Sequence, residues 1–290
     1  MTHGSCVAGA SVQSGSWQGL QVWDVQAQGA RARISAFGGQ LLQWEPQADE
    51  PVLWLSPLLQ DLPVPLRGGV PLCWPWFGRQ GQAADAPSHG LARTAVWVLQ
   101  HWQVLDGGRV ELLLAPEQPL HPVLHVHQVL RIGQTLEQEL HTHHRGNEAL
   151  ALSQALHSYF QVPHVAGVAV HGLEGVGFDD ALHPERTQAQ QGAWQWSLAT
   201  DGGRYDRVYR HADGELVLVR GGGRRPVRIQ TKGASSLVLW TPGPGLAAKM
   251  PDVGDAWEHY LCLEAGNVGQ DAVVLQPGQS HLLGQRLALA

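Results

Sequence analysis

The feature that most constrains the fold is a recurrence of short apolar or alternating runs separated by turn signals. Runs of this kind are typical of β-strands, and the Asp-Gly, Gly-Gly and Pro-Gly pairs between them supply residues that tolerate positive φ. The chain contains 35 glycines and 18 prolines spread along its length, which leaves little room for long helices. We therefore expect strands at 20–25, 95–104, 110–114, 123–132, 150–156, 215–219, 236–240 and 260–263.

The same pattern predicts an all-β protein, a large antiparallel β-sandwich with few short helices. The segment 252–260 is the best helical candidate. A chain of 290 residues, 43% of them hydrophobic, can bury a sizeable core. Because neither an internal repeat nor a linker-like change in composition interrupts it, we expect residues 1–290 to form a single domain.

Charge and cysteine content exclude several classes of function. Only 15% of the residues are charged, the formal net charge is -6, and no basic stripe is present, so we expect no nucleic-acid partner. Cys6, Cys73 and Cys262 are too few and too scattered for a disulfide framework, which fits a reducing compartment. No apolar stretch reaches membrane-spanning length and no signal segment begins the sequence, which predicts a soluble, cytoplasmic protein without a membrane partner.

Two distant segments each place one proton-transfer group inside an apolar run. His157 lies in 155–160 (ALHSYF) and Glu264 in 261–267 (LCLEAGN). A histidine can donate a proton near neutral pH and a glutamate can accept one, so the two would form an acid/base pair if they faced each other. Taken alone, a histidine on an apolar strand is more often a hydrogen-bonded core residue. Glu264 is the stronger signal, because burying a carboxylate without a partner is costly.

The segment with the most functional signals runs from 67 to 78 (RGGVPLCWPWFG) and is followed by 88–93 (SHGLAR). Glycines beside Arg67 let the backbone approach a ligand closely, and the prolines stiffen the loop. Arginine binds phosphate with two parallel hydrogen bonds, so Arg67 and Arg93 together would make a phosphate clamp. The alternatives are surface salt bridges for both arginines, and a purely structural role in capping the core for Trp74 and Trp76.

The sixteen histidines raise the question of a metal site. Strand alternation would place His125 and His127 on the same face, and a second group of histidines follows at 141, 143 and 144. A third ligand with defined spacing is missing, however. We therefore expect no metal and interpret these histidines as surface or rim residues.

Six motifs resemble those of the hexose-6-phosphate mutarotases, also called glucose-6-phosphate 1-epimerases, of the aldose 1-epimerase superfamily. In chain order they are RGGVPLCWPWFG at 67–78, HGLAR at 89–93, ALHSYF at 155–160, YDRVY at 205–209, LVLWTPG at 237–243 and CLEAGNV at 262–268. The resemblance implies a galactose-mutarotase-type antiparallel β-sandwich, in agreement with the strand pattern.

The resemblance also implies the roles of individual residues. His157 would be the general acid at the ring oxygen, and Glu264 the general base at the anomeric hydroxyl. The substrate-binding residues that it implies are Arg67, Arg93, Asp206, His89 and Ser88. Taken without the family, Asp206 could instead pair with a neighbouring arginine, Arg204 or Arg207.

Three positions depart from the family pattern without removing a proton-transfer group. Ser88 stands where relatives often carry a larger polar residue, Tyr205 replaces a common threonine, and Leu91 replaces a usual phenylalanine. These differences bear on sugar selectivity rather than on reaction type. Lys249 lies near the LVLWTPG motif and could support a phosphate, although a solvated lysine is the simpler interpretation.

The implied function is interconversion of the α and β anomers of a hexose 6-phosphate, with glucose 6-phosphate as the expected substrate. Proton transfer suffices for this reaction, so we expect no cofactor, a small-molecule sugar phosphate as the partner, and a monomer. Two alternatives remain open. One is a non-catalytic carbohydrate-binding β-sandwich, which has no need of a histidine–glutamate pair. The other is a mutarotase for unphosphorylated aldoses, which needs the pair but not two phosphate-binding arginines.

Overall fold

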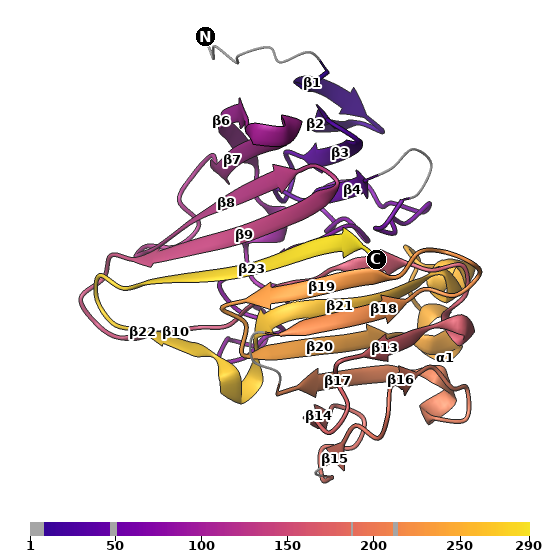
Figure 1. The fold of residues 1–290 in the computed structure, drawn as a ribbon. Coiled ribbons are helices and arrows are strands. Elements are labelled where there is room, and N and C mark those ends of the chain that lie inside the picture. Colours follow the sequence, from indigo (N-terminus) through magenta and orange to yellow (C-terminus); the bar gives the residue numbers. More distant parts are fainter. Residues whose placement is uncertain (1–8, 47–50, 187, 211–213) are drawn as a thin grey trace.

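The computed structural model describes residues 9–46, 51–186, 188–210 and 214–290. In this part of the chain, two large antiparallel sheets pack face to face, and a smaller sheet from the N-terminal region extends one end of the assembly (Figure 1). The all-β prediction is confirmed. Cys6 lies outside the described residues.

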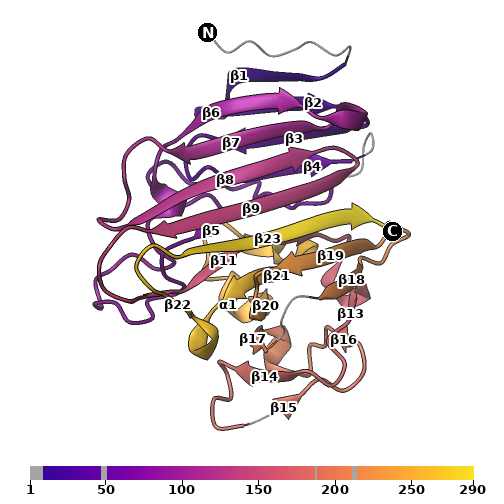
Figure 2. The ribbon, with the colours of Figure 1, turned by 60° about the vertical axis from the view of Figure 1, so that its left-hand side comes forward.

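The larger sheet has nine strands in the order β16-β13-β18-β19-β23-β9-β8-β7-β6 (Figure 2). Their bounds are β6 Trp97–Val104, β7 Val110–Pro116, β8 Leu124–Ile132, β9 Thr135–His144, β13 Ala169–His171, β16 Trp194–Gln195, β18 Glu215–Val219, β19 Val227–Lys232 and β23 Ser280–Leu289. The smaller N-terminal sheet consists of β1 Ser11–Trp17, β2 Leu20–Ala27, β3 Ala30–Ser35 and β4 Leu41–Glu45.

The second large sheet, which we call the site sheet, has the order β15-β14-β17-β20-β21-β11-β5, with β12 also paired to β21. Its strands are β5 Leu72–Cys73, β11 Gln154–Leu156, β12 Tyr159–Gln161, β14 Gly177–Asp180, β15 Gln188–Ala189, β17 Tyr205–Tyr209, β20 Ser236–Thr241 and β21 Tyr260–Asn267. A two-stranded ribbon joins β10 Leu150–Leu152 to β22 Val273–Leu275.

The expected strands are all present, with one difference: the run at 150–156 divides at Ser153 into β10 and β11, which belong to different sheets. The helical candidate at 252–260 is present as a 3-10 helix over Gly254–His259. The α-helix found in the described residues is the short α1, Gly243–Ala247.

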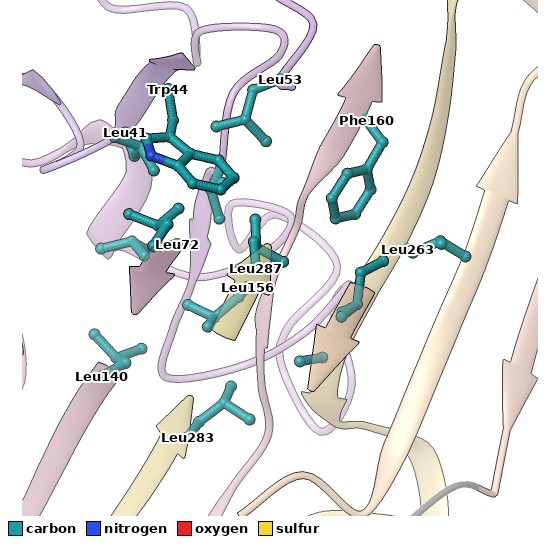
Figure 3. Close-up of a cluster of buried hydrophobic side chains, with 14 of the residues drawn as sticks. Leu41, Trp44, Leu53, Leu72, Leu140, Leu156, Phe160, Leu263, Leu283 and Leu287 are labelled. Atoms are coloured by element: carbon teal, nitrogen blue, oxygen red, sulfur yellow. The ribbon is translucent and has the colours of Figure 1, made fainter. Parts of the chain in front are cut away.

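The core lies between the two large sheets, and leucines from both supply much of it. Leu140 of β9, together with Leu283 and Leu287 of β23, faces Leu156 and Leu263 of the site sheet (Figure 3). Each of these side chains is fully buried, which stabilises the fold by roughly 1.5–3 kcal/mol per residue. Side chains of a strand alternate between the two faces of its sheet. The residues that follow Leu156 and Leu263 in the chain therefore point to the outer face of the site sheet, away from the core.

Candidate catalytic site

Strand pairing brings the two expected proton-transfer residues together. The strand β21 pairs Ala265 with Leu156 of β11 and Cys262 with Tyr159 of β12. This register is continuous across the gap between β11 and β12, so His157 stands opposite Glu264. Directly opposed residues of an antiparallel pair have their Cβ atoms about 4.5–5.5 Å apart, close enough for side-chain contact.

The resulting pair is tight and buried. Nε2 of His157 lies 3.3 Å from Oε1 of Glu264, and the two side chains are 10% and 1% exposed. The backbone N–H of His157 donates to the carbonyl of Pro71, which fixes this residue against the loop before β5. Nδ1 of His157 and Oε2 of Glu264 have no hydrogen-bond partner, so both groups keep a free polar atom for a substrate.

Burial controls the protonation of both groups. Loss of solvation lowers the pKa of His157 well below 6.5, and the nearby positive charges of Arg67 and Arg93 lower it further. Burial raises the pKa of Glu264 well above 4.5, helped by the negative charge of Asp206. Burial therefore favours the uncharged form of each group in the free protein, a neutral imidazole beside a carboxylic acid.

Arg67 reaches the site from a glycine loop that packs closely on its neighbours. Gly68 and Gly69 adopt positive φ, and a Cβ at Gly69 would lie 2.2 Å from the carbonyl oxygen of Leu41. The guanidinium Nε lies 2.8 Å from Oδ2 of Asp252, and Nη1 donates to the hydroxyl of Tyr159 at 3.0 Å. With 28% of its side chain exposed, Arg67 is held in place yet remains accessible.

Arg93 lies in a 3-10 turn at 92–94, and its Nη2 donates to the carbonyl of Ser88 at 2.6 Å. In the described part of the chain no carboxylate forms an ion pair with Arg93, whereas Arg67 is paired with Asp252. Burial lowers the pKa of Arg93, which is the expected effect of taking a cation out of water without neutralising it. Ser88 thus contributes a backbone contact, and Arg93 retains donors for an anion.

His89 combines a strained backbone with a fixed ring. Its φ is 61°, which few residues other than glycine adopt, and its Nδ1 accepts a hydrogen bond from the N–H of Gly78. Burial, followed by the charges of Arg93, Arg67 and Arg79, lowers its pKa to about 3. The ring is therefore neutral with its proton on Nε2, and its centroid lies 5.8 Å from that of His157.

Asp206 approaches the pair from β17, where it stands opposite Trp240 of β20. Its side chain is 30% exposed and lies 3.5 Å from Nη2 of Arg204, one of its two expected structural partners. The other, Arg207, instead pairs with Asp180. Burial raises the pKa of Asp206, so this carboxylate is free enough of strong partners to accept hydrogen bonds from a ligand.

Comparison with known proteins identifies the family of this chain. The family model described as aldose 1-epimerase matches residues 21–288. The chain belongs to the aldose 1-epimerase family. It is 34% identical over 244 residues to a Salmonella typhimurium protein and 31% identical over 264 residues to one from Escherichia coli, both provisionally named glucose-6-phosphate 1-epimerase. These matches cover 81% and 87% of this chain, and 79% and 85% of the relatives.

A solved structure gives the same answer for the fold. The crystal structure of a provisionally named mutarotase from Salmonella typhimurium superimposes with a TM-score of 0.85 at 28% identity, covering 100% of this chain and 96% of that one. The galactose-mutarotase-type sandwich expected from the sequence is thereby confirmed. No helix in the described residues of this family member has the length and apolar character needed to span a membrane.

Four residues at the candidate site were assigned no role there from the sequence: Tyr159, Cys262, Trp240 and Asp252. The ring of Tyr159 stacks on that of His157 with centroids 4.8 Å apart, and Trp240 meets the same ring edge-on at 6.4 Å. Residues two positions apart on a strand lie on the same face. Counting two positions from His157 and from Glu264 would therefore have identified Tyr159 and Cys262. No sequence signal identified Asp252, which lies far along the chain from Arg67.

The described residues contain one group of three potential metal ligands, namely His157, Cys262 and Glu264, whose ligand atoms lie within 4.8 Å of one another. The positive charges of Arg67 and Arg93 beside it disfavour a cation there. The rings of His127 and His141 stack at 4.7 Å on the nine-stranded sheet, away from this group. A metal-independent reaction remains a prediction.

Three further expectations concern residues around the aldose 1-epimerase site. Trp74 is fully buried and donates to Thr142, so its structural role is confirmed. Trp76 is partly exposed and donates to the carbonyl of Pro87. Lys249 is exposed and lines the same hollow as Arg204, the residue that directly precedes β17 and its Asp206.

Proposed function

We propose that this aldose epimerase interconverts the α and β anomers of a hexose 6-phosphate, with glucose 6-phosphate as the substrate. The observation that carries the proposal is the buried contact of 3.3 Å between His157 and Glu264, with Arg67 and Arg93 close by. The names of the Salmonella typhimurium and Escherichia coli relatives support the choice of sugar.

The closeness of the pair suits the chemistry of a cyclic sugar. In a hemiacetal the ring oxygen and the hydroxyl oxygen are bonded to the same carbon, so an acid and a base that serve both must also be neighbours. Glu264 removes the proton of the C1 hydroxyl while His157 protonates the ring oxygen. The bond between C1 and the ring oxygen breaks, and an open-chain aldehyde forms. Rotation about C1–C2 and closure with reversed roles give the other anomer.

The proton count of the pair fits this cycle. Ring opening ends with the proton on Glu264 and with a neutral His157, which is the arrangement that burial favours in the free protein. Ring opening requires the opposite arrangement, an anionic Glu264 and a protonated His157, and proton transfer from Glu264 to His157 produces it. Since nothing is gained or lost over the cycle, the reaction needs no redox partner and no covalent intermediate.

The remaining site residues would orient the sugar. Arg93 has donors that no carboxylate neutralises, and Arg67 is held rigidly by Asp252, so together they suit a phosphate. Asp206 can accept hydrogen bonds from sugar hydroxyls, and Nε2 of the neutral His89 can donate one. The side chain of Glu264 is buried, whereas those of Arg67 and Asp206 are partly exposed to solvent. In this proposal the sugar enters from the side of Arg67 and Asp206.

Anomer exchange measured by NMR tests the proposal. The rate of exchange between the two C1 signals is compared, with and without protein, for glucose 6-phosphate, galactose 6-phosphate, glucose and galactose. We expect the largest acceleration for glucose 6-phosphate. Equal or greater acceleration for the free sugars would instead indicate a mutarotase for unphosphorylated aldoses. Saturable binding without acceleration would indicate a carbohydrate-binding module.

A further inference from the structure

A chain of buried polar side chains crosses the core behind His157. Ser158 donates through its hydroxyl to Oε1 of Gln285 at 2.9 Å, and Nε2 of Gln285 donates to Oε1 of Gln138 at 2.9 Å. Nε2 of Gln138 donates to Oε1 of Gln128 at 2.6 Å, and Nε2 of Gln128 donates to the carbonyl of Gly39 at 2.8 Å. We call Ser158, Gln285, Gln138 and Gln128 the glutamine chain.

These residues occupy positions that strand alternation assigns to the hydrophobic core. Gln138 and Leu140 are two residues apart on β9 and are both fully buried, and Ser158 lies between the core residues Leu156 and Phe160. Buried amides are tolerated where their hydrogen bonds are satisfied, and every polar side-chain atom of the glutamine chain has a partner. A leucine at such positions would be simpler, so the polar residues call for a reason beyond packing.

One end of the glutamine chain holds the backbone beside the catalytic pair. Ser158 directly follows His157, and its carbonyl accepts from the N–H of Leu263, which directly precedes Glu264. The hydroxyl of Ser158 points into the core, whereas His157 points to the opposite face. A displacement of Ser158 therefore displaces His157 relative to Glu264.

The other end holds the loops that carry the two arginines. Gly38 packs against the backbone of Arg93, because a Cβ at Gly38 would lie 2.9 Å from the Arg93 carbonyl oxygen. Gln40 donates to the carbonyl of Gly68 at 2.7 Å, beside Arg67. The turn at 38–40 thus contacts both arginine loops, and the glutamine chain ends on Gly39 in its middle.

We propose that the glutamine chain is a positioning network that sets His157 relative to the turn at 38–40 and hence to the two arginines. All four hydrogen bonds run in one direction, from Ser158 to Gly39, so each amide dipole reinforces the next. The network connects the reacting end of the site with its anion-binding end through the middle of the sandwich. This inference rests on the proposed function for its kinetic readout.

The test replaces Gln138, the middle of the network, by methionine, which keeps the shape but removes the hydrogen bonds. Leu140→Met is the matched control on the same strand and face. We expect Gln138→Met to lower kcat on glucose 6-phosphate by about 10- to 100-fold, the effect of a small misplacement of a reacting group, and Leu140→Met to change it less than about twofold. Adding Ser158→Ala to Gln138→Met should lower kcat no further, because the network is already interrupted.

A second readout does not depend on activity. The imidazole ¹⁵N signals of His157 are identified by their loss in His157→Asn, and we expect them to shift in Gln138→Met but not in Leu140→Met. Should Gln138→Met fail to fold, Ser158→Ala, which removes a single oxygen, carries the same measurements. An unchanged kcat together with unchanged His157 signals would overturn the positioning role. A wild-type protein that does not accelerate anomer exchange would instead refute the proposed function, and the NMR comparison would still decide the positioning role.

Discussion

One histidine–glutamate pair lies at the candidate catalytic site and another lies on β9, and the two have the same separation. Nε2 of His157 is 3.3 Å from Glu264, and Nε2 of His141 is 3.3 Å from Glu139. Their surroundings differ. On β9 the side chains are 31% and 15% exposed, and Glu139 also binds Arg131. The comparison shows that distance alone does not make an acid/base pair.

The protonation of the two glutamates differs accordingly. Burial would raise the pKa of Glu139, but the hydrogen bond and charge of Arg131, with smaller contributions from Lys232 and His141, lower it below 4.5. Among the described residues no arginine or lysine forms an ion pair with Glu264, and burial raises its pKa well above 4.5. A carboxylate held as an anion by Arg131 and Lys232 is a poor proton carrier, whereas a desolvated carboxylate beside one histidine can exchange a proton with it.

The largest expected effect is a loss of anomer exchange when the buried pair is changed, but not when the pair on β9 is changed. His157→Asn and Glu264→Gln should each lower anomer exchange by at least ~10²-fold, because each removes a general acid or base. His141→Asn and Glu139→Gln should change it less than about twofold. Exchange rates are measured by NMR on variants whose folding is checked by circular dichroism. Near-wild-type exchange in a folded His157 or Glu264 variant would contradict the mechanism.

The next largest effect is a loss of kcat/KM when the arginines of the candidate site are changed, in contrast to Arg131 beside the pair on β9. Arg67→Ala and Arg93→Ala should each weaken kcat/KM for glucose 6-phosphate by roughly 1.5–3 kcal/mol, the scale of a hydrogen bond to a charged group, with the larger loss at Arg93 because no carboxylate neutralises it. Lysine at either position should restore only part of the loss, because it keeps the charge but not the two-pronged geometry. Arg131→Ala on β8 is the control and should leave kcat/KM unchanged. Equal losses on free glucose would mean that the arginines shape the site rather than bind phosphate.

The smallest expected effect is a change in folding stability. Replacing Glu264 by glutamine should raise the stability, and replacing Glu139 by glutamine should lower it. The raised pKa of Glu264 means that the folded state binds the proton more tightly than the unfolded state, so stability falls as pH rises above 4.5. Glu264→Gln should therefore stabilise the fold by about 1–3 kcal/mol at pH 7–8, and the gain should shrink toward pH 4.5.

The lowered pKa of Glu139 works the other way. Its stabilising contribution is present above pH 4.5 and is lost as pH falls through the lowered value in the folded state. Glu139→Gln should therefore destabilise the fold at pH 7, by less than about 1 kcal/mol because the pair is partly exposed. Thermal unfolding of both variants between pH 4.5 and 8 checks the two signs. A loss of stability in Glu264→Gln at pH 8 would show that the buried carboxylate is better paired than the structure indicates.

Local pattern was sufficient for the strands whose hydrophobic residues dominate. It failed at β9 and β23, where polar side chains occupy the solvent-facing positions and buried glutamines interrupt the core-facing ones. A binary pattern treats Gln138 and Gln285 as surface residues, whereas the structure satisfies their amides inside the sandwich.

The candidate site shows the same division. The resemblance to family motifs identified His157 and Glu264, and the pairing of β21 with β11 and β12 explains why they are in contact. Asp252 and its ion pair with Arg67 depend on two loops meeting across the end of the sandwich. Such a long-range contact leaves no periodic trace in the sequence, because neither residue belongs to a strand whose register could predict it.

The position of β21 and β23 in the two sheets has a consequence for how the protein is made. Each of these late strands is interior to its sheet: β21 lies between β20 and β11, and β23 lies between β19 and β9. A nascent chain that still lacks them has two open sheets, with exposed strand edges and no partner for His157. Pairing of such distant segments is slow, and unpaired edges favour aggregation during synthesis. The neighbours of β21 therefore stay without this partner until the strand that carries Glu264 has left the ribosome.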